Sequence, residues 1–190
     1  MTREDIAARI RAFASTRNHR RVNALVVHCS ANAEGQDIGA AEIRRCHVKE
    51  NGWADIGYHF VVRIDGTIEE GRDLNRAGAH VTGHNARTIG ICYVGGLEAT
   101  RNSKGAIVPK KDARGRSIEK DTRTPQQKES LRWLLETLAA ELPTVRAILG
   151  HRDFSPDKNG NGVIDPWERI KGCPCFDAIP EYEDIVFDRD

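Results

Sequence analysis

The sequence lacks the features that mark membrane-spanning, disulfide-stapled and nucleic-acid-binding chains. No segment of its 190 residues approaches the ~20 consecutive apolar residues that a membrane-spanning helix needs. Its five cysteines are scattered and odd in number, which argues against a disulfide framework. The 29 lysines and arginines nearly cancel the 28 aspartates and glutamates, so no bulk positive charge attracts nucleic acid. We therefore expect neither membrane insertion nor a nucleic-acid partner.

The N-terminal segment also lacks the apolar core of a secretory signal. It is typical instead of a short amphipathic helix, with Ile6, Ile10 and Phe13 on one side. We expect a helical extension over residues 1–20, followed by one domain over residues 21–182. The chain is then expected to be synthesised in the cytoplasm without an export signal of its own.

From residue 21 onward, apolar runs typical of strands alternate with helical patterns. The predicted strands cover residues 24–28, 57–64, 67–70, 88–94 and 145–149, and the predicted helices cover residues 38–51 and 124–142. Thr124, Pro125 and Gln127 have the types and spacing of a capped helix start. Residues 97–123 are polar and without period, which predicts a long loop or a loose hairpin. The sum predicts a single-domain α/β fold, with a central mixed β-sheet flanked by α-helices.

Polar side chains with metal-binding chemistry follow two of these strands. His28 ends the first strand, His151 follows the last, and Cys173 lies next to a proline. Imidazole and thiolate are donors that Zn²⁺ prefers, and three protein ligands leave a fourth position for water, as in catalytic sites. A single histidine at a strand end is more often structural, so spacing alone allows a catalytic zinc site without requiring it.

Longer motifs resemble those of a known family, and this resemblance favours a catalytic zinc site over structural histidines. The chain resembles the type-2 N-acetylmuramoyl-L-alanine amidases, the family of phage T7-type lysozyme and the peptidoglycan-recognition proteins. The matching stretches, spread from about residue 24 to residue 178, are VVHCSA, EIRRCHVKENGWADIGYHFVVRIDGTIEEGRD, GAHVTGHNARTIGICYVGG, GHRD and KGCPCFD. The Lys-x-Cys-Pro motif is most similar to that of the phage endolysins.

The resemblance implies a zinc amidase domain and a role for each matching residue. His28, His151 and Cys173 would bind zinc, which lowers the pKa of a bound water towards ~7 and polarises the scissile carbonyl. Tyr58 would direct its hydroxyl at that water or carbonyl, and Lys171 would place its ammonium near the developing oxyanion. The implied substrate is peptidoglycan.

Other residues of the same motifs have expected roles outside the zinc site. His80 and Asn85 lie in a glycine-flanked loop that lines the substrate groove in relatives, and we expect them to touch substrate. His59, adjacent to Tyr58 on a strand, faces the opposite side and is expected to be structural. His47 is expected in the core, and Cys175 is expected to be structural because a fourth protein ligand would exclude water.

A second metal motif lies between His151 and Cys173. Residues 157–168 satisfy every defined position of the EF-hand pattern D-x-[DN]-x-[DN]-G-x5-E, and the hydrophobic Ile164 occupies the eighth place. The alternative is a glycine- and asparagine-rich surface turn that matches by chance. We expect a Ca²⁺ ion whose ligands are Asp157, Asn159, Asn161, the Val163 carbonyl, Asp165 and Glu168.

The preferred function is therefore a phage or prophage endolysin that cuts the amide bond between N-acetylmuramic acid and L-alanine. It would act as a monomer at the bacterial wall after holin-mediated release. An intracellular muropeptide-recycling amidase is one alternative, but the acidic residue expected near the strand of Tyr58 is not evident. A non-catalytic recognition module is another, although such members characteristically lose the cysteine ligand. A third alternative is a calcium-responsive binding protein, for which the EF-hand-like residues 157–168 are the only evidence.

Overall fold

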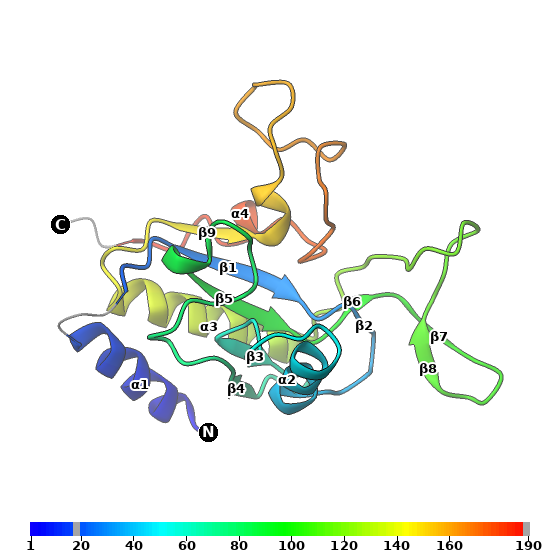
Figure 1. The fold of residues 1–190 in the computed structure, drawn as a ribbon, viewed down its shortest axis with the longest axis horizontal. Helices are drawn as coiled ribbons and strands as arrows, with labels where there is room; N and C mark the ends of the chain where they lie inside the picture. Colours follow the sequence, from blue (N-terminus) through cyan, green and yellow to red (C-terminus); the bar gives the residue numbers. More distant parts are fainter. Residues whose placement is uncertain (17–19, 188–190) are drawn as a thin grey trace.

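A five-stranded mixed sheet organises the computed structural model, which describes residues 1–16 and 20–187 (Figure 1). Its strands, in spatial order, are β4 (Ile68–Glu70), β3 (Phe60–Val62), β5 (Thr88–Tyr93), β1 (Ala24–Cys29) and β9 (Ala147–Gly150). Only β4 pairs antiparallel, through the hairpin predicted at Asp65–Gly66. The predicted mixed α/β architecture is confirmed, with helices on both faces of the sheet.

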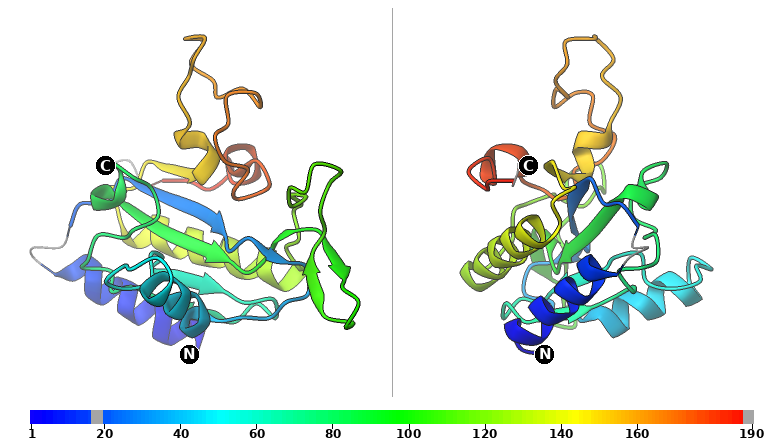
Figure 2. Two further views of the ribbon diagram at one scale, coloured as in Figure 1. Left: turned by 45° about the vertical axis from the view of Figure 1, so that its right-hand side comes forward. Right: turned by 90° about the vertical axis from the view of Figure 1, so that its left-hand side faces the viewer.

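One face of the sheet packs against two long helices. These are α1 (Arg3–Ser15) and α3 (Pro125–Glu141), which lie side by side in Figure 2. The three apolar residues predicted on one side of the first helix, Ile6, Ile10 and Phe13, are all buried in the main core. The helical extension expected over residues 1–20 thus contributes to the core of the domain, while residues 17–19 of that range lie outside the described residues.

The opposite face carries the short helix α2 (Ala40–Lys49) and the polar side chains of interest. On β3, Phe60 and Val62 face the main core, whereas Val61 packs with α2 in a second, smaller cluster. On β1, Leu25, Val27 and Cys29 belong to the main core. Because side chains alternate along a strand, His28 must point to the α2 side of the sheet.

The start of α3 is fixed to the sheet by the predicted cap. The Thr124 hydroxyl accepts a hydrogen bond from the Gln127 amide at 3.1 Å, and the Gln127 side chain accepts one from the Thr124 amide at 3.0 Å. The fully buried Gln127 also donates to the carbonyls of Val62 and Val94, at 3.1 and 2.9 Å. Gln127 therefore both caps α3 and fixes its N-terminal end to β3 and to the residue that follows β5.

Two segments project from the sheet-and-helix body (Figure 1). One is the hairpin of β7 (Ala99–Arg101) and β8 (Ile107–Pro109), which resolves the loop-or-hairpin alternative in favour of a hairpin. It is reached through β6 (Gly96–Leu97), which pairs with β2 (Asn32–Ala33). The other segment contains residues 155–172 and leads from η2 (His151–Phe154) towards α4 (Ala178–Glu181). A further short helix, η1 (Asn85–Arg87), directly precedes β5. No helix in the described part of the chain is long and apolar enough to span a bilayer.

Candidate metal centre

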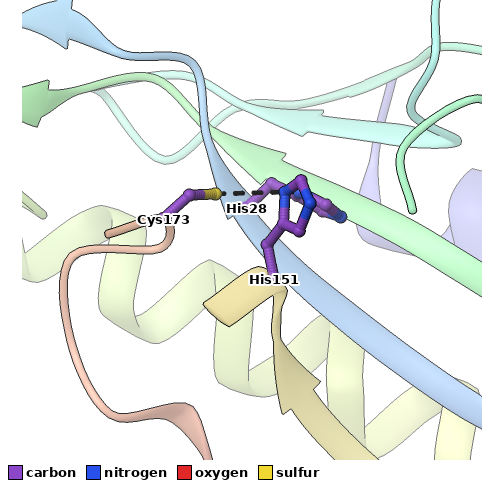
Figure 3. Close-up of side chains that lie close together, drawn as sticks. All are labelled: His28, His151 and Cys173. Carbon is purple, nitrogen blue, oxygen red and sulfur yellow. Dashed lines mark hydrogen bonds between the residues drawn. The ribbon is translucent and has the colours of Figure 1, made fainter. Parts of the chain in front are cut away.

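Three side chains with metal-ligand chemistry meet at one edge of the sheet. One ligand atom each from His28, His151 and Cys173 lies within 4.8 Å of the other two, and Figure 3 shows the three groups facing one another. The Cys173 sulfur is 3.7 Å from Nδ1 of His28. Among the described residues, this is the one such group of three or more histidine, cysteine or acidic side chains.

The parallel pairing of β1 and β9 brings the two histidines together. Val27 is in register with Gly150, so His28 and His151 lie at the same carboxyl edge of neighbouring strands. Their rings are 4.8 Å apart. The register of two strands thus brings together two candidate metal ligands that are more than 120 positions apart in sequence.

Backbone contacts hold Cys173 against this pair. The Cys29 amide, next to His28, donates to the Cys173 sulfur at 3.2 Å, and the Arg152 amide, next to His151, donates to the Cys173 carbonyl at 2.8 Å. An amide that points at the sulfur stabilises the thiolate, the form that binds metal.

The spacing and chemistry of these donors fit zinc. Zinc–sulfur and zinc–nitrogen bonds of about 2.3 and 2.1 Å at a tetrahedral angle place two ligand atoms roughly 3.5 Å apart. The observed 3.7 Å between the Cys173 sulfur and Nδ1 of His28 is close to that span. Three donors also leave one coordination position open, as a catalytic site requires.

Both histidines are held neutral, as metal ligands must be. Burial lowers the pKa of His28 well below its ordinary value, with further lowering by His80, His151 and Lys171. Burial lowers the pKa of His151 to about 4, and the positive charge of Lys171 adds to that effect. Protons therefore do not compete with a metal ion at neutral pH.

The two expected catalytic side chains flank the ligands. The Tyr58 ring lies 5.1 Å from that of His28, and burial raises the pKa of Tyr58 well above its ordinary value, so its hydroxyl remains a donor. Lys171 is exposed and lies two positions before Cys173 in the sequence, and its positive charge contributes to the lowered pKa of His28 and His151.

His80 and Asn85, expected at the substrate groove, occupy the layer behind the ligands. His80 is only 7% exposed, and its Nδ1 lies 3.0 Å from Nε2 of His28. The Asn85 side-chain oxygen accepts hydrogen bonds from the amides of His80 and Val81, at 2.8 and 2.9 Å. Thr88 was not predicted from the sequence as a site residue, yet its hydroxyl lies 3.3 Å from Nε2 of His80. The alternation of side chains along β5 could have identified Thr88, because it places Thr88 and Gly90 on the same face of the sheet as His28.

Neighbouring polar residues have structural contacts. His59 is 1% exposed and accepts a hydrogen bond from the Gly90 amide at 3.0 Å, as expected of a structural histidine. The core position expected for His47 is wrong, because its ring is half-buried. It lies 4.6 Å from the Trp53 ring and accepts a hydrogen bond from the Gly57 amide at 3.0 Å. Cys175 lies outside the ligand group, with its sulfur 3.7 Å from that of Cys29.

The segment that matches the EF-hand pattern forms a turn closed by its own acidic side chains. The Asp157 carboxylate accepts from the amides of Gly160 and Gly162, at 2.7 and 2.8 Å. Asp165 accepts from the side-chain amides of Asn159 and Asn161, at 2.9 and 3.2 Å. These hydrogen bonds close the loop, but among the described residues Asp157, Asp165 and Glu168 do not form a group of three converging metal-ligand atoms.

Glu168, the last position of the motif, is fully buried within that loop. One of its oxygens accepts from the amides of Lys158 and Asn159, at 2.6 and 3.2 Å, and the other accepts from the Asp165 amide at 2.9 Å. A carboxylate buried without a cationic partner is costly, and here three backbone donors offset that cost.

A family model and curated relatives both match this chain over most of its length. A family model described as N-acetylmuramoyl-L-alanine amidase matches residues 18–167. The endolysin of Enterobacteria phage K11 is 38% identical over 151 residues, covering 80% of this chain and 79% of that protein. The endolysin of Escherichia phage T7 is 39% identical over 155 residues, 82% of each chain.

Solved structures share the fold. The N-acetylmuramoyl-L-alanine amidase LysC from Clostridium intestinale URNW superposes with a TM-score of 0.60 at 25% identity, over 91% of this chain and 90% of that one. Bumblebee PGRP-SA superposes with a TM-score of 0.57 over 90% of each chain, and at 18% identity it shows likeness of fold alone.

Proposed function

This chain belongs to the N-acetylmuramoyl-L-alanine amidase family, and we propose that His28, His151 and Cys173 form its zinc-dependent catalytic centre. The chain is an amidase of the endolysin type, which hydrolyses the bond between N-acetylmuramic acid and L-alanine of peptidoglycan. The observation that carries the zinc proposal is the convergence of three candidate ligand atoms within 4.8 Å, with the Tyr58 ring beside that of His28.

The donor set supports zinc over harder cations. Two neutral imidazoles and a thiolate suit a borderline-soft ion, whereas calcium and magnesium prefer oxygen. Zinc bound here would polarise the scissile carbonyl and supply a water of lowered pKa. The protein holds both imidazoles neutral by burial and directs the Cys29 amide at the Cys173 sulfur.

Tyr58 and Lys171 act on the substrate in this proposal. The Tyr58 hydroxyl stays protonated, so it can donate a hydrogen bond to the scissile carbonyl oxygen. Lys171 brings a positive charge to the edge of the same site, where negative charge develops on that oxygen. Preorganised donors of this kind stabilise the tetrahedral transition state.

The place of action follows from the substrate. Peptidoglycan lies outside the bacterial cytoplasm, so we infer that the protein acts at the cell wall as a monomer, after release by a holin. His80 and Asn85 lie behind the candidate metal-binding side chains, and their contact with substrate stays a prediction.

The activity test compares two cysteine variants on purified peptidoglycan. Cys173→Ser should lose bound zinc and the release of new L-alanine amino termini, because a neutral hydroxyl is a poor zinc ligand. Cys46→Ser, which changes a half-exposed thiol on α2 outside the ligand group, is the matched control and should retain both. Wild-type activity that survives removal of all metal would refute the zinc centre.

We also propose a Ca²⁺ site in residues 157–168. The six motif positions provide oxygen ligands of the type that calcium prefers, and the buried Glu168 already fixes the two ends of the loop together. Calcium would draw the carboxylates of Asp157, Asp165 and Glu168 together, offset their mutual repulsion and stiffen the chain that leads to Lys171 and Cys173.

Calcium binding is measurable separately from zinc. Titration calorimetry of the zinc-loaded protein should detect one Ca²⁺ ion, and Ca²⁺ should raise the melting temperature by binding the folded state. Glu168→Gln should weaken both responses, whereas excess Zn²⁺ should not reproduce them. Absence of any heat of binding at millimolar Ca²⁺ would return the loop to an ordinary surface turn.

A further inference from the structure

A chain of buried side chains leads from a backbone carbonyl to the metal-facing atom of His28. The Thr88 hydroxyl lies 3.0 Å from the His84 carbonyl and 3.3 Å from Nε2 of His80. Nδ1 of His80 in turn lies 3.0 Å from Nε2 of His28. The far nitrogen of the His28 ring, Nδ1, faces the Cys173 sulfur.

The carbonyl at one end fixes the direction of every hydrogen bond in this chain. A carbonyl can only accept, so the Thr88 hydroxyl donates its one hydrogen to His84 and accepts from Nε2–H of His80. A neutral His80 with its hydrogen on Nε2 presents a bare Nδ1, which accepts from Nε2–H of His28. His28 then carries no hydrogen on Nδ1, and that lone pair points to where a metal would bind.

Two glycines form a slot of the right size for the His80 ring. A Cβ on Gly78 would lie 2.4 Å from a ring carbon of His80, and a Cβ on Gly90 would lie 2.6 Å from two ring carbons. Neither glycine has a positive φ, so backbone conformation does not require glycine at these positions. The space they leave is occupied by the imidazole.

Asn85 holds the backbone that carries this ring. Its side-chain oxygen receives the amides of both His80 and Val81, which fixes the loop before β5. The His80 ring is therefore constrained by its slot, by its backbone and by hydrogen bonds at both nitrogens.

We propose that His80 is a positioning residue, whose Nδ1 accepts Nε2–H of His28 and thereby fixes the His28 tautomer and ring orientation for metal binding. Asn85 and Thr88 support it. This inference rests on the zinc centre proposed above, and it gives His80 a role that needs no contact with substrate. Partners of this kind typically change metal affinity by 10- to 100-fold when removed.

A matched pair of variants isolates the hydrogen bond from the packing. Leucine and asparagine have nearly the same shape, but only asparagine can present an acceptor near the position of Nδ1. Zinc affinity is measured by competition with a chromogenic chelator. We expect His80→Leu to weaken zinc binding by roughly 10- to 100-fold, and His80→Asn to recover most of that loss.

The tautomer is a second readout that needs no variant. Long-range ¹H–¹⁵N spectra of the wild-type protein, metal-free and zinc-loaded, should show hydrogen on Nε2 of both His28 and His80. Hydrogen on Nδ1 of His28 in the metal-free protein would overturn the inference, even where His80→Leu fails to fold.

The outcomes separate this inference from the zinc proposal. If the wild-type protein binds zinc and both His80 variants bind it equally tightly, the positioning role is wrong and the zinc centre stands. If the wild-type protein binds no zinc, the zinc centre is wrong and His80 has nothing to position. Equal weakening in both variants would assign the loss to packing and also refute the hydrogen bond.

Discussion

Acid should destabilise the metal-free protein, and His59 accounts for a defined part of that effect. Its Nδ1 accepts the Gly90 amide at 3.0 Å, so the ring hydrogen is on Nε2, where it is donated to the Arg76 carbonyl at 3.0 Å. A second proton on Nδ1 would face the amide hydrogen of Gly90, with the Arg20 guanidinium 2.9 Å from Nε2. Burial first, and the charge of Arg20 second, lower the pKa of His59 to about 3.

The sign and size of the effect follow from proton binding. An unfolded chain protonates this histidine below pH ~6.5, whereas the folded protein does so only near pH 3. Between these values the unfolded state binds more protons, so stability falls as pH falls. From pH 7.5 to 5 the loss is about 2 kcal/mol for His59, or about 4–8 °C in melting temperature for a domain of this size. His80, whose pKa burial lowers to about 2, adds a loss of the same sign.

Urea unfolding in the presence of a chelator, at several pH values from 7.5 to 5, measures this dependence. His59→Asn keeps an oxygen to accept the Gly90 amide but cannot titrate. Its stability should fall less steeply than that of the wild type, by about 1.4 kcal/mol per pH unit below pH 6. His84→Asn, a change at an exposed imidazole, controls for the loss of a histidine as such. Parallel curves for wild type and His59→Asn would refute the reasoning.

Two further predictions concern catalysis and the anchoring of α3. Tyr58→Phe and Lys171→Ala should each retain zinc and slow amide hydrolysis by roughly 10²-fold, the scale of one lost oxyanion donor; near-native rates in both would remove them from the chemical step. Gln127→Glu would turn a carboxylate towards the carbonyls of Val62 and Val94, in place of two donated hydrogen bonds. Unfolding in urea should then show a loss of about 2–5 kcal/mol, and an unchanged midpoint would mean that the capping contacts alone fix this helix.

Local sequence patterns determined the elements and the chemistry that they carry. The apolar runs of β1 and β5, the Asp65–Gly66 turn and the Thr124 cap are short-range features, set by side chains a few positions apart. The candidate metal-binding residues were also available from the sequence, because imidazoles at two strand ends and a thiol next to a proline, combined with family motifs, predict zinc.

Only the tertiary structure decided how those residues act on one another. The contact between His28 and His80 joins positions 52 apart, and its direction depends on Thr88, on the far side of the His80 ring. His47, which the helical pattern placed in the core, is half-buried because its neighbours are Trp53 and Tyr58 rather than the sheet. Periodicity reports which face a side chain takes, but not which partner that face meets. That partner is set by strand register and loop closure over long separations, which here bring His80 against His28.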